Sequence, residues 1–170
     1  ILGGVVLDRP TQHEQRITEL LAARAVPFRL HAHVVSRTVA DAEALLPFPL
    51  DSLLKTVVFR VKGGPWVLVA CRGQDRVDYR RLADACGVKR ADLARPGPEE
   101  VEAALGFAIG GISPIPPDAA TLAIVDTTAA ATLGTVYCGA GRNDRTLEIA
   151  IADLIAVAGA RVLPVVQAGD

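Results

Sequence analysis

Two features of this sequence could take part in chemistry: a lysine inside an apolar segment and a loop that contains two adjacent glycines. Lys55 lies within Leu53–Phe59, whose other residues are apolar except for Thr56. Burying an ammonium group is unfavourable unless it meets an anion or faces a cleft. Alternatively, a lysine at a strand end can extend its side chain so that the charge reaches solvent. The residues are compatible with both interpretations.

The glycine loop runs from Gly106 to Pro114 and contains the adjacent pair Gly110 and Gly111. Because glycine has no Cβ atom, the backbone there can approach a ligand closely. Its N–H groups could hold a carbonyl oxygen and a developing oxyanion. Pro114 restricts the backbone of Ser113, which should stiffen the loop. A plain turn between a helix and a strand is the alternative interpretation.

The sequence lacks the familiar catalytic and cofactor-binding patterns. Gly139–Gly141 begins like a dinucleotide-binding fingerprint, but no third glycine follows and no helix is predicted there. A Walker A loop is missing, and Gly111–Ile115 lacks the final glycine of a nucleophile elbow. We therefore expect no cofactor and no Ser-His-Asp mechanism.

The histidines and cysteines do not predict a metal site. His31 and His33 would point to the same side of a strand, which a metal could use, but exposed or hydrogen-bonded imidazoles are the commoner reason for such a pair. Cys71, Cys86 and Cys138 are odd in number and form no close pair. This favours a reducing, cytoplasmic environment, with each thiol acting as a small buried hydrophobe.

Composition and charge narrow the class of protein. The chain has 170 residues, of which 51% are hydrophobic and 22% charged, and its net charge of −1 argues against non-specific coating of nucleic acid. However, residues 1–95 carry 15 Lys and Arg against 10 Asp and Glu, whereas residues 96–170 carry 3 against 9. The basic part could hold one phosphorylated end of a nucleic acid, or its charges could lie on solvated helix faces. No apolar run reaches the roughly 18 residues of a membrane helix, so we expect no membrane partner.

Spacing, caps and turn residues predict the elements that must position these groups. Helices are predicted from Thr11 to Pro27, over Val39–Leu46 after a capping Thr38, and at Asp78–Cys86, Pro98–Leu105 and Asp153–Ala158. Leu53–Val61 and Trp66–Cys71 form a predicted hairpin, and further strands are predicted at Phe28–His33, Leu122–Asp126, Thr135–Cys138, Leu147–Ile151 and Arg161–Val166. We predict one α+β domain over residues 1–170, with a mixed, curved sheet and flanking helices.

Several short motifs, taken in order, resemble a known family. They are a histidine before 38–42, Leu54–Val57, Arg76–Asp78, the helix to Gly87 with 88–90 after it, Gly106–Phe107, Gly110–Pro114, the strand ending at Asp126, and Gly139–Leu147. On these residues the chain is similar to the YbaK/ProX-like aminoacyl-tRNA deacylases, free-standing relatives of the editing insertion domain of bacterial prolyl-tRNA synthetase. The Lys-Thr pair and the Gly-Gly-Ile-Ser-Pro loop are specific together, although each alone is weak.

The resemblance runs from about Phe28 to Leu154, and implies a deacylase core over residues 28–166 after an N-terminal helical segment over residues 1–27. It also implies the family's mixed sheet and hydrolysis of the ester that joins a wrong amino acid to the tRNA 3′ end. An aminoacyl ester is already activated, so hydrolysis needs water, positioning and oxyanion stabilisation rather than a protein nucleophile.

The resemblance also assigns roles to residues. Lys55 would act at the acceptor end, with the backbone of Gly110 and Gly111 holding the aminoacyl carbonyl. The implied substrate-binding residues are His33, Thr38, Thr56, Ile112, Ser113, Pro114 and Gly139. His33 fits the histidine position better than His31 by its spacing to Thr38.

The expected substrate is tRNA, tRNA(Pro) in particular, mischarged with a small amino acid such as Ala, Ser, Thr or Cys. Pocket size would set this preference, because one methylene is worth only about 1–3 kcal/mol. Val34, Val35, Leu45, Leu46 and Ile112 are candidates for the pocket wall. The expected partner is the aminoacyl-tRNA 3′ end, and an aminoacyl-tRNA synthetase is a candidate partner.

Two other interpretations compete with an enzyme. The domain could bind tRNA acceptor ends without hydrolysing them, which the basic N-terminal part would serve equally well. It could also be a structural protein without a ligand, and a buried ion pair between Lys55 and an internal carboxylate would favour that interpretation.

Overall fold

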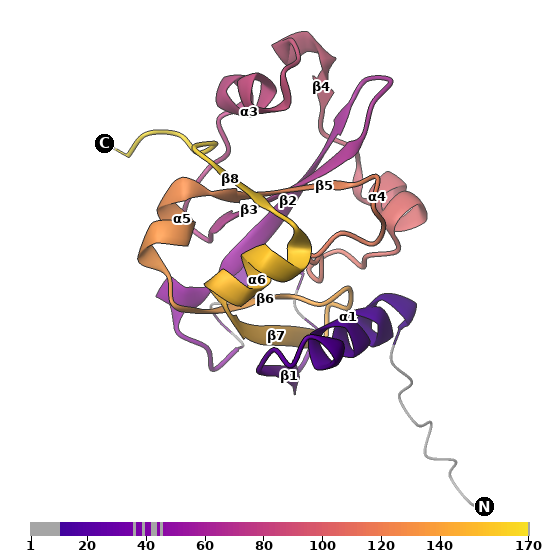
Figure 1. Cartoon of the computed structure of the whole chain (residues 1–170), viewed down its shortest axis with the longest axis vertical. Coiled ribbons are helices and arrows are strands. Elements are labelled where there is room, and N and C mark those ends of the chain that lie inside the picture. The colour runs from indigo at the N-terminus through magenta and orange to yellow at the C-terminus, as the bar shows by residue number, and fades with distance from the viewer. Residues whose placement is uncertain (1–10, 36, 39, 42–43, 45, 170) are drawn as a thin grey trace, which may run out of the picture.

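Two β-sheets form the centre of the computed structural model, which describes residues 11–35, 37–38, 40–41, 44 and 46–169 (Figure 1). The first sheet has the strand order β1-β7-β6, and all of its strands are antiparallel: β1 (Phe28–Ala32), β6 (Thr135–Gly139) and β7 (Arg145–Ala150). The second has the order β4-β2-β3-β5-β8, with β2 (Leu54–Val61), β3 (Trp66–Arg72), β4 (Leu93–Ala94), β5 (Leu122–Asp126) and β8 (Arg161–Leu163). It is mixed, as predicted, because β2 runs antiparallel to β3 and β4 whereas β5 runs parallel to β3 and β8.

The strands divide into two sheets, whereas the sequence predicted one curved sheet. After β5 the chain enters helix α5 (Thr127–Thr132) and returns as β6, which pairs with β7. An isolated bridge between Leu53 and Tyr137 brings the start of β2 beside β6. The two sheets therefore meet at one corner, and the start of β2 lies at that corner.

Apolar side chains from both sheets and three helices share one core, to which α5 contributes Ala129. Helix α1 (Gln12–Ala23) contributes Ile17 and Leu21, and helix α6 (Ile151–Ala158) contributes Leu154. Helix α3 (Tyr79–Cys86) covers a second cluster around Phe59, and helix α4 (Pro98–Leu105) covers a third around Phe107. In Figure 1, α1 and the three-stranded sheet lie at one end of the molecule, and α3 and β4 lie at the other.

The predicted helix signals are confirmed where the structure describes them. The Thr11 hydroxyl caps α1 by accepting the Glu14 N–H at 3.2 Å, and the Asp78 carboxylate caps α3. Gly87 ends α3 with φ +68°, in the left-handed region that glycine tolerates. The last strand ends at Leu163, short of the predicted Val166, because Pro164 has no N–H for a sheet hydrogen bond.

Part of the predicted helix over Val39–Leu46 lies outside the described residues. Residues 39, 42, 43 and 45 belong to that part, whereas Ala40, Asp41 and Ala44 are helical. The Thr38 hydroxyl accepts the N–H of Asp41 at 3.0 Å, which is the capping interaction that the sequence predicted. None of the helices in the described part of the chain has the length and apolar character that a bilayer span requires.

Asp126 joins β5, α5 and the C-terminal segment through one buried carboxylate. It is 1% exposed, and it accepts the N–H groups of Thr128 at 2.9 Å and of Val165 at 3.0 Å. We predict that Asp126→Ala lowers the free energy of unfolding by about 2–3 kcal/mol, because it leaves two buried donors without an acceptor. Asp118→Ala is the matched control, since Asp118 accepts similar bonds in an exposed turn before β5. Urea unfolding should show the larger loss for Asp126→Ala, and equal losses would contradict this account.

Candidate functional site

Strand β2 places Lys55 opposite Cys71 of β3, at the corner where the two sheets meet. Its ammonium group donates to the carbonyl oxygens of Gly73, at 3.1 Å from Nζ, and of Asp75. The Asp75 carboxylate is held by Arg72, with Nε–Oδ2 2.8 Å and Nη2–Oδ1 3.0 Å. Across the described residues, no carboxylate forms an ion pair with Lys55. Neutral carbonyl dipoles thus orient the ammonium group without cancelling its charge.

The glycine loop forms a turn in which only some of the backbone N–H groups are free to bind a ligand. Gly110 adopts φ +84°, a conformation that favours glycine. The N–H of Gly111 donates to the carbonyl of Ala108 at 2.9 Å, so it is already used within the turn. In the described part of the chain, the N–H groups of Ile109, Gly110 and Ile112 have no protein acceptor. These groups, rather than the N–H of Gly111, are the free donors at this turn.

A second glycine-containing loop presses against this turn, backbone to backbone. The N–H of Gly141 donates to the Gly111 carbonyl at 2.6 Å, and the Gly141 carbonyl accepts the Ala108 N–H at 3.0 Å. A Cβ atom on Gly111 would lie 2.2 Å from the backbone of Arg142, and one on Gly139 would lie 2.2 Å from the carbonyl oxygen of Ile112. Glycine is therefore required at both positions for steric reasons.

One cavity of about 300 Å³ brings together most of the predicted site residues. Lys55 and Gly110 both line it, from the strand and from the turn respectively. The other predicted residues that line it are His33, Thr38, Thr56, Ile112 and Gly139. Lys55 and the glycine turn thus lie on the same cavity.

Three predicted site residues do not line this cavity. Gly111 is buried against the second loop, and Ser113 and Pro114 are buried behind the turn. The Ser113 hydroxyl accepts the N–H of Ile115 at 3.1 Å, so it stabilises the local chain direction. These residues shape the loop and do not present a group to the cavity.

The predicted wall residues are also divided. Leu46 and Ile112 line the cavity. Val34 and Val35 are 61% and 50% exposed and do not line it. Leu45 lies outside the described residues.

His33 reaches the cavity, whereas His31 does not line it. The His33 ring lies 2.6 Å from the Val34 carbonyl through Nδ1 and 2.8 Å from the Thr146 hydroxyl through Nε2. A carbonyl only accepts hydrogen bonds, so we assign the proton to Nδ1, and Nε2 then accepts from Thr146. His31 instead lies 3.4 Å from Glu148 and packs against the Phe48 ring. The described residues contain no group of three or more His, Cys, Asp or Glu side chains that could hold a metal ion.

Cys138 lines the cavity but is unsuited to be a nucleophile. It is 3% exposed, and burial raises the pKa of its thiol to about 12. The reactive thiolate is therefore scarce at neutral pH. Both nitrogens of His33 are engaged, Nδ1 with the Val34 carbonyl and Nε2 with the Thr146 hydroxyl. The cavity can hold and polarise a ligand through Lys55 and the backbone donors.

Sequence reasoning missed several residues of the cavity wall. Tyr137 and Thr146 come from β6 and β7, and Arg95 follows β4. All three are far from Lys55 in the sequence. No motif contains Tyr137 or Arg95, and Thr146 lies within the matching segment Gly139–Leu147 without being singled out by it. Only the pairing of the strands brings them to the cavity.

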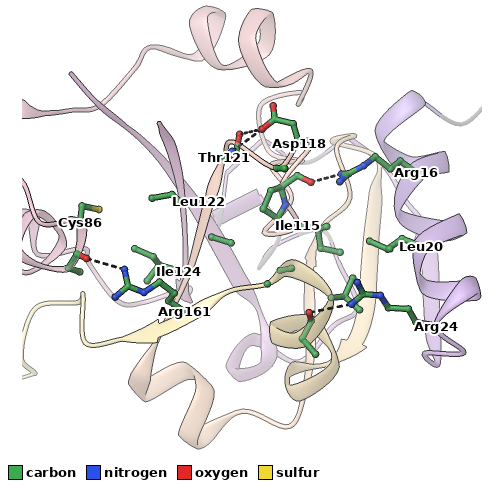
Figure 2. Close-up of a pocket in the computed structure, with 18 residues that line it drawn as sticks. Arg16, Leu20, Arg24, Cys86, Ile115, Asp118, Thr121, Leu122, Ile124 and Arg161 are labelled. Atoms are coloured by element: carbon green, nitrogen blue, oxygen red, sulfur yellow. Dashed lines mark hydrogen bonds between the residues drawn. The ribbon is translucent and has the colours of Figure 1, made fainter. Parts of the chain in front are cut away.

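A separate cavity of about 450 Å³ contains none of the predicted site residues (Figure 2). Arg16 of α1, Arg24 at the C-cap of this helix and Arg161 of β8 reach backbone carbonyls around it. It shares no lining residue with the Lys55 cavity. These arginines lie outside the candidate site, so their substitution can serve as a control for substitutions of basic residues near Lys55.

The close contact at Gly139 generates a prediction. Gly139→Ala should lower the free energy of unfolding by about 2–3 kcal/mol, because the added methyl group overlaps the Ile112 carbonyl and the loop must move. Gly134→Ala is the matched control, since Gly134 immediately precedes the same strand and a Cβ there meets nothing within 4 Å. Thermal and urea unfolding of both variants should separate them. A neutral effect of Gly139→Ala would contradict the tight loop contact.

Comparisons with known proteins agree with this geometry. Residues 33–157 match the family model of the aminoacyl-tRNA editing domain. The fold is similar to that of the hypothetical protein APE2540, with a TM-score of 0.79 and 26% identity over 89% of this chain and 99% of that one. It is also similar to a protein proposed to be a trans-editing enzyme for prolyl-tRNA synthetase, with a TM-score of 0.77 and 23% identity over 94% of this chain and 100% of that one. Because the family match spans well over half of the sequence, the chain belongs to the aminoacyl-tRNA editing domain family.

Proposed function

We propose that this editing domain is a deacylase that hydrolyses the ester of tRNA charged with a wrong, small amino acid, with tRNA(Pro) as the expected carrier. The observation that carries the proposal is that Lys55 lines the same cavity as Gly110 and Ile112, whose N–H groups have no acceptor among the described residues. The ammonium group suits the phosphate or ribose oxygens of the terminal nucleotide. The backbone N–H groups suit the carbonyl oxygen of the ester.

In the proposed reaction, water attacks the carbonyl carbon of the aminoacyl ester. The negative charge that develops on the carbonyl oxygen is stabilised by the N–H groups of Gly110 and Ile112, and one such donor is worth about 3–4 kcal/mol. The bond to the ribose oxygen then breaks, the proton given up by the attacking water passes through the neighbouring ribose hydroxyl to the released oxygen, and the amino acid leaves as the free acid. The high pKa of the buried Cys138 thiol supports a path in which this cysteine forms no covalent intermediate.

The size of the cavity supports a small amino acid as the acyl group. A volume of about 300 Å³ is at the lower end of the range for ligand pockets, and it must also take part of the terminal adenosine. Leu46, Val57 and Ile112 provide apolar wall. Ala, Ser, Thr and Cys fit this description, and discrimination among them rests on about 1–3 kcal/mol per methylene.

A basic cavity next to the candidate site supports a nucleic-acid substrate. It has a volume of about 740 Å³ and shares Lys55, Val57 and Arg95 with the candidate site. Arg76 and Arg80 also line it, and both are exposed. Its one lining carboxylate among the described residues, Asp78, accepts the backbone N–H groups that begin α3. The excess of positive charge suits the phosphates that lead to a tRNA 3′ end.

The main test is a deacylation panel with tRNA(Pro) and other tRNAs charged with Ala, Ser, Thr or Cys, and correctly charged Pro-tRNA(Pro) as the control substrate. We expect hydrolysis of one or more mischarged species and little hydrolysis of the correct one. Lys55→Ala should lower kcat/KM by about 100-fold or more, the size of effect seen when a stabilising charge or donor is removed. Lys62→Ala, an exposed lysine at the hairpin turn, is the matched control.

The outcomes separate the interpretations. Unchanged turnover in Lys55→Ala refutes the role of this lysine. Tight binding of aminoacyl-tRNA by the wild type without hydrolysis of any substrate supports the binding module instead.

The basic cavity generates a second prediction. Replacing Arg76, Arg80 and Arg95 together with Ala should raise KM for mischarged tRNA about tenfold or more and reduce the slope of log affinity against log salt by about 2. Hydrolysis of a 3′-aminoacyl adenosine, which lacks the neighbouring phosphates, should change less than that of mischarged tRNA, because Arg76 and Arg80 do not line the Lys55 cavity whereas Arg95 does. The control is the triple Ala variant of Arg16, Arg24 and Arg161, which loses the same charge around the other cavity (Figure 2). Equal effects of the two triple variants would show that net charge alone matters.

A further inference from the structure

The first turn of α1 buries two polar side chains that the proposed reaction does not use. His13 is 7% exposed and Glu14 is 6% exposed. Both ring nitrogens of His13 and one carboxylate oxygen of Glu14 have no hydrogen-bond partner in the described structure. Burial, with a smaller effect of the Arg16 guanidinium, lowers the pKa of His13 to about 4, so the ring is neutral near pH 7. Buried polar groups without partners are unfavourable and call for an explanation.

The His13 ring packs directly against the contact between the two loops of the site. Its Cδ2 atom lies 2.9 Å from the position that a Cβ on Gly141 would occupy. On another side, the ring meets Phe107 at 4.4 Å between centroids and 72° between planes. Gly141 holds the turn through its hydrogen bonds to Gly111 and Ala108. The ring therefore supports both loops where they are joined.

Glu14 begins a second chain of contacts that ends at the cavity. One of its carboxylate oxygens lies 3.8 Å from Nη1 of Arg142. The Arg142 guanidinium binds the Asp144 carboxylate through Nε at 2.8 Å and Nη2 at 2.7 Å. The Asp144 carbonyl in turn accepts the N–H of His33 at 3.0 Å. Helix α1 is thus connected to His33 as well as to the glycine turn.

We propose that His13 and Glu14 are positioning residues of the candidate site. Both lie outside residues 33–157, the part of the chain that matches the family. They fix the two loops so that Gly110 and the His33 ring keep their places at the cavity. The inference rests on the proposed function for its catalytic consequence. His13 acts through its shape, because neither of its ring nitrogens has a partner. Glu14 acts through its charge on Arg142.

Because His13 acts through the shape of its ring, removing the ring and replacing it with another aromatic ring should have different effects on the two loops. His13→Ala removes the ring and leaves a void under Gly141, so the loops lose their support. His13→Phe keeps an aromatic ring of similar outline, so it should preserve the contact with Phe107. Leu21→Ala is the matched control, since Leu21 lies on the same helix, is 0% exposed and packs in the core between the sheets.

The experiment measures three quantities for the wild type and the variants of the full chain: thermal stability, kcat and KM for mischarged tRNA, and hydrogen exchange at the Ala108 and Gly141 amides. His13→Ala should lower kcat about 10- to 100-fold with little change in KM, and should speed exchange at these two amides. Glu14→Gln should have a weaker effect in the same direction. His13→Phe should restore kcat, and Leu21→Ala should lower stability while leaving kcat and these two amides near wild type.

The outcomes distinguish this inference from the proposed function. If the wild type hydrolyses no substrate, the deacylase proposal fails, and the exchange measurement still decides whether His13 supports the loops. Faster exchange confined to the two loop amides in His13→Ala supports the inference. Equal kcat and exchange in His13→Ala and Leu21→Ala, or no recovery in His13→Phe, would overturn it.

Discussion

The backbone contact between the turn at 108–112 and the loop at 139–142 is the constraint on which the candidate site depends. Two hydrogen bonds join Gly141 to this turn, and a Cβ atom on Gly111 or Gly139 would lie within 2.2 Å of the opposite backbone. Contacts this short are possible only with glycine, so the sequence must place glycines in two distant segments. The contact leaves the Gly110 N–H without an acceptor among the described residues, and Gly110 lines the cavity. Rigid backbone donors of this kind stabilise a developing charge without having to reorganise during the reaction.

Much of the fold could be predicted because its signals are local. Helix ends are marked by the capping side chains of Thr11 and Asp78 and by the left-handed backbone of Gly87. The turn residues at 62–65 mark the hairpin between β2 and β3. Helix α5 has six residues and β4 has two, so neither is long enough to show a hydrophobic period. The division into two sheets was also beyond prediction, because it depends on which strands pair after β5.

The candidate site could be predicted in part for the same reason. Lys55 and Gly110 stand out from their immediate neighbours, and the cavity contains both. The exclusion of Gly111, Ser113 and Pro114 from the lining follows from hydrogen bonds and burial that a sequence does not reveal. The choice of His33 over His31 depends on β1 ending at Ala32, after which the chain turns His33 toward Thr146. Thr146 itself is 113 residues away from His33, so only strand pairing identifies it.

The partners of Lys55 explain how one lysine can serve a polyanionic substrate. A buried carboxylate beside the ammonium group would stabilise it strongly, but the pair would be neutral and would attract an incoming phosphate only weakly. Here the carbonyls of Gly73 and Asp75 solvate the charge, and Arg72 occupies the Asp75 carboxylate. Lys55 lies at the border of two cavities, and none of the described carboxylates forms an ion pair with it. The cost of holding a charge in a strand is thus met by dipoles, and the charge stays available to the substrate.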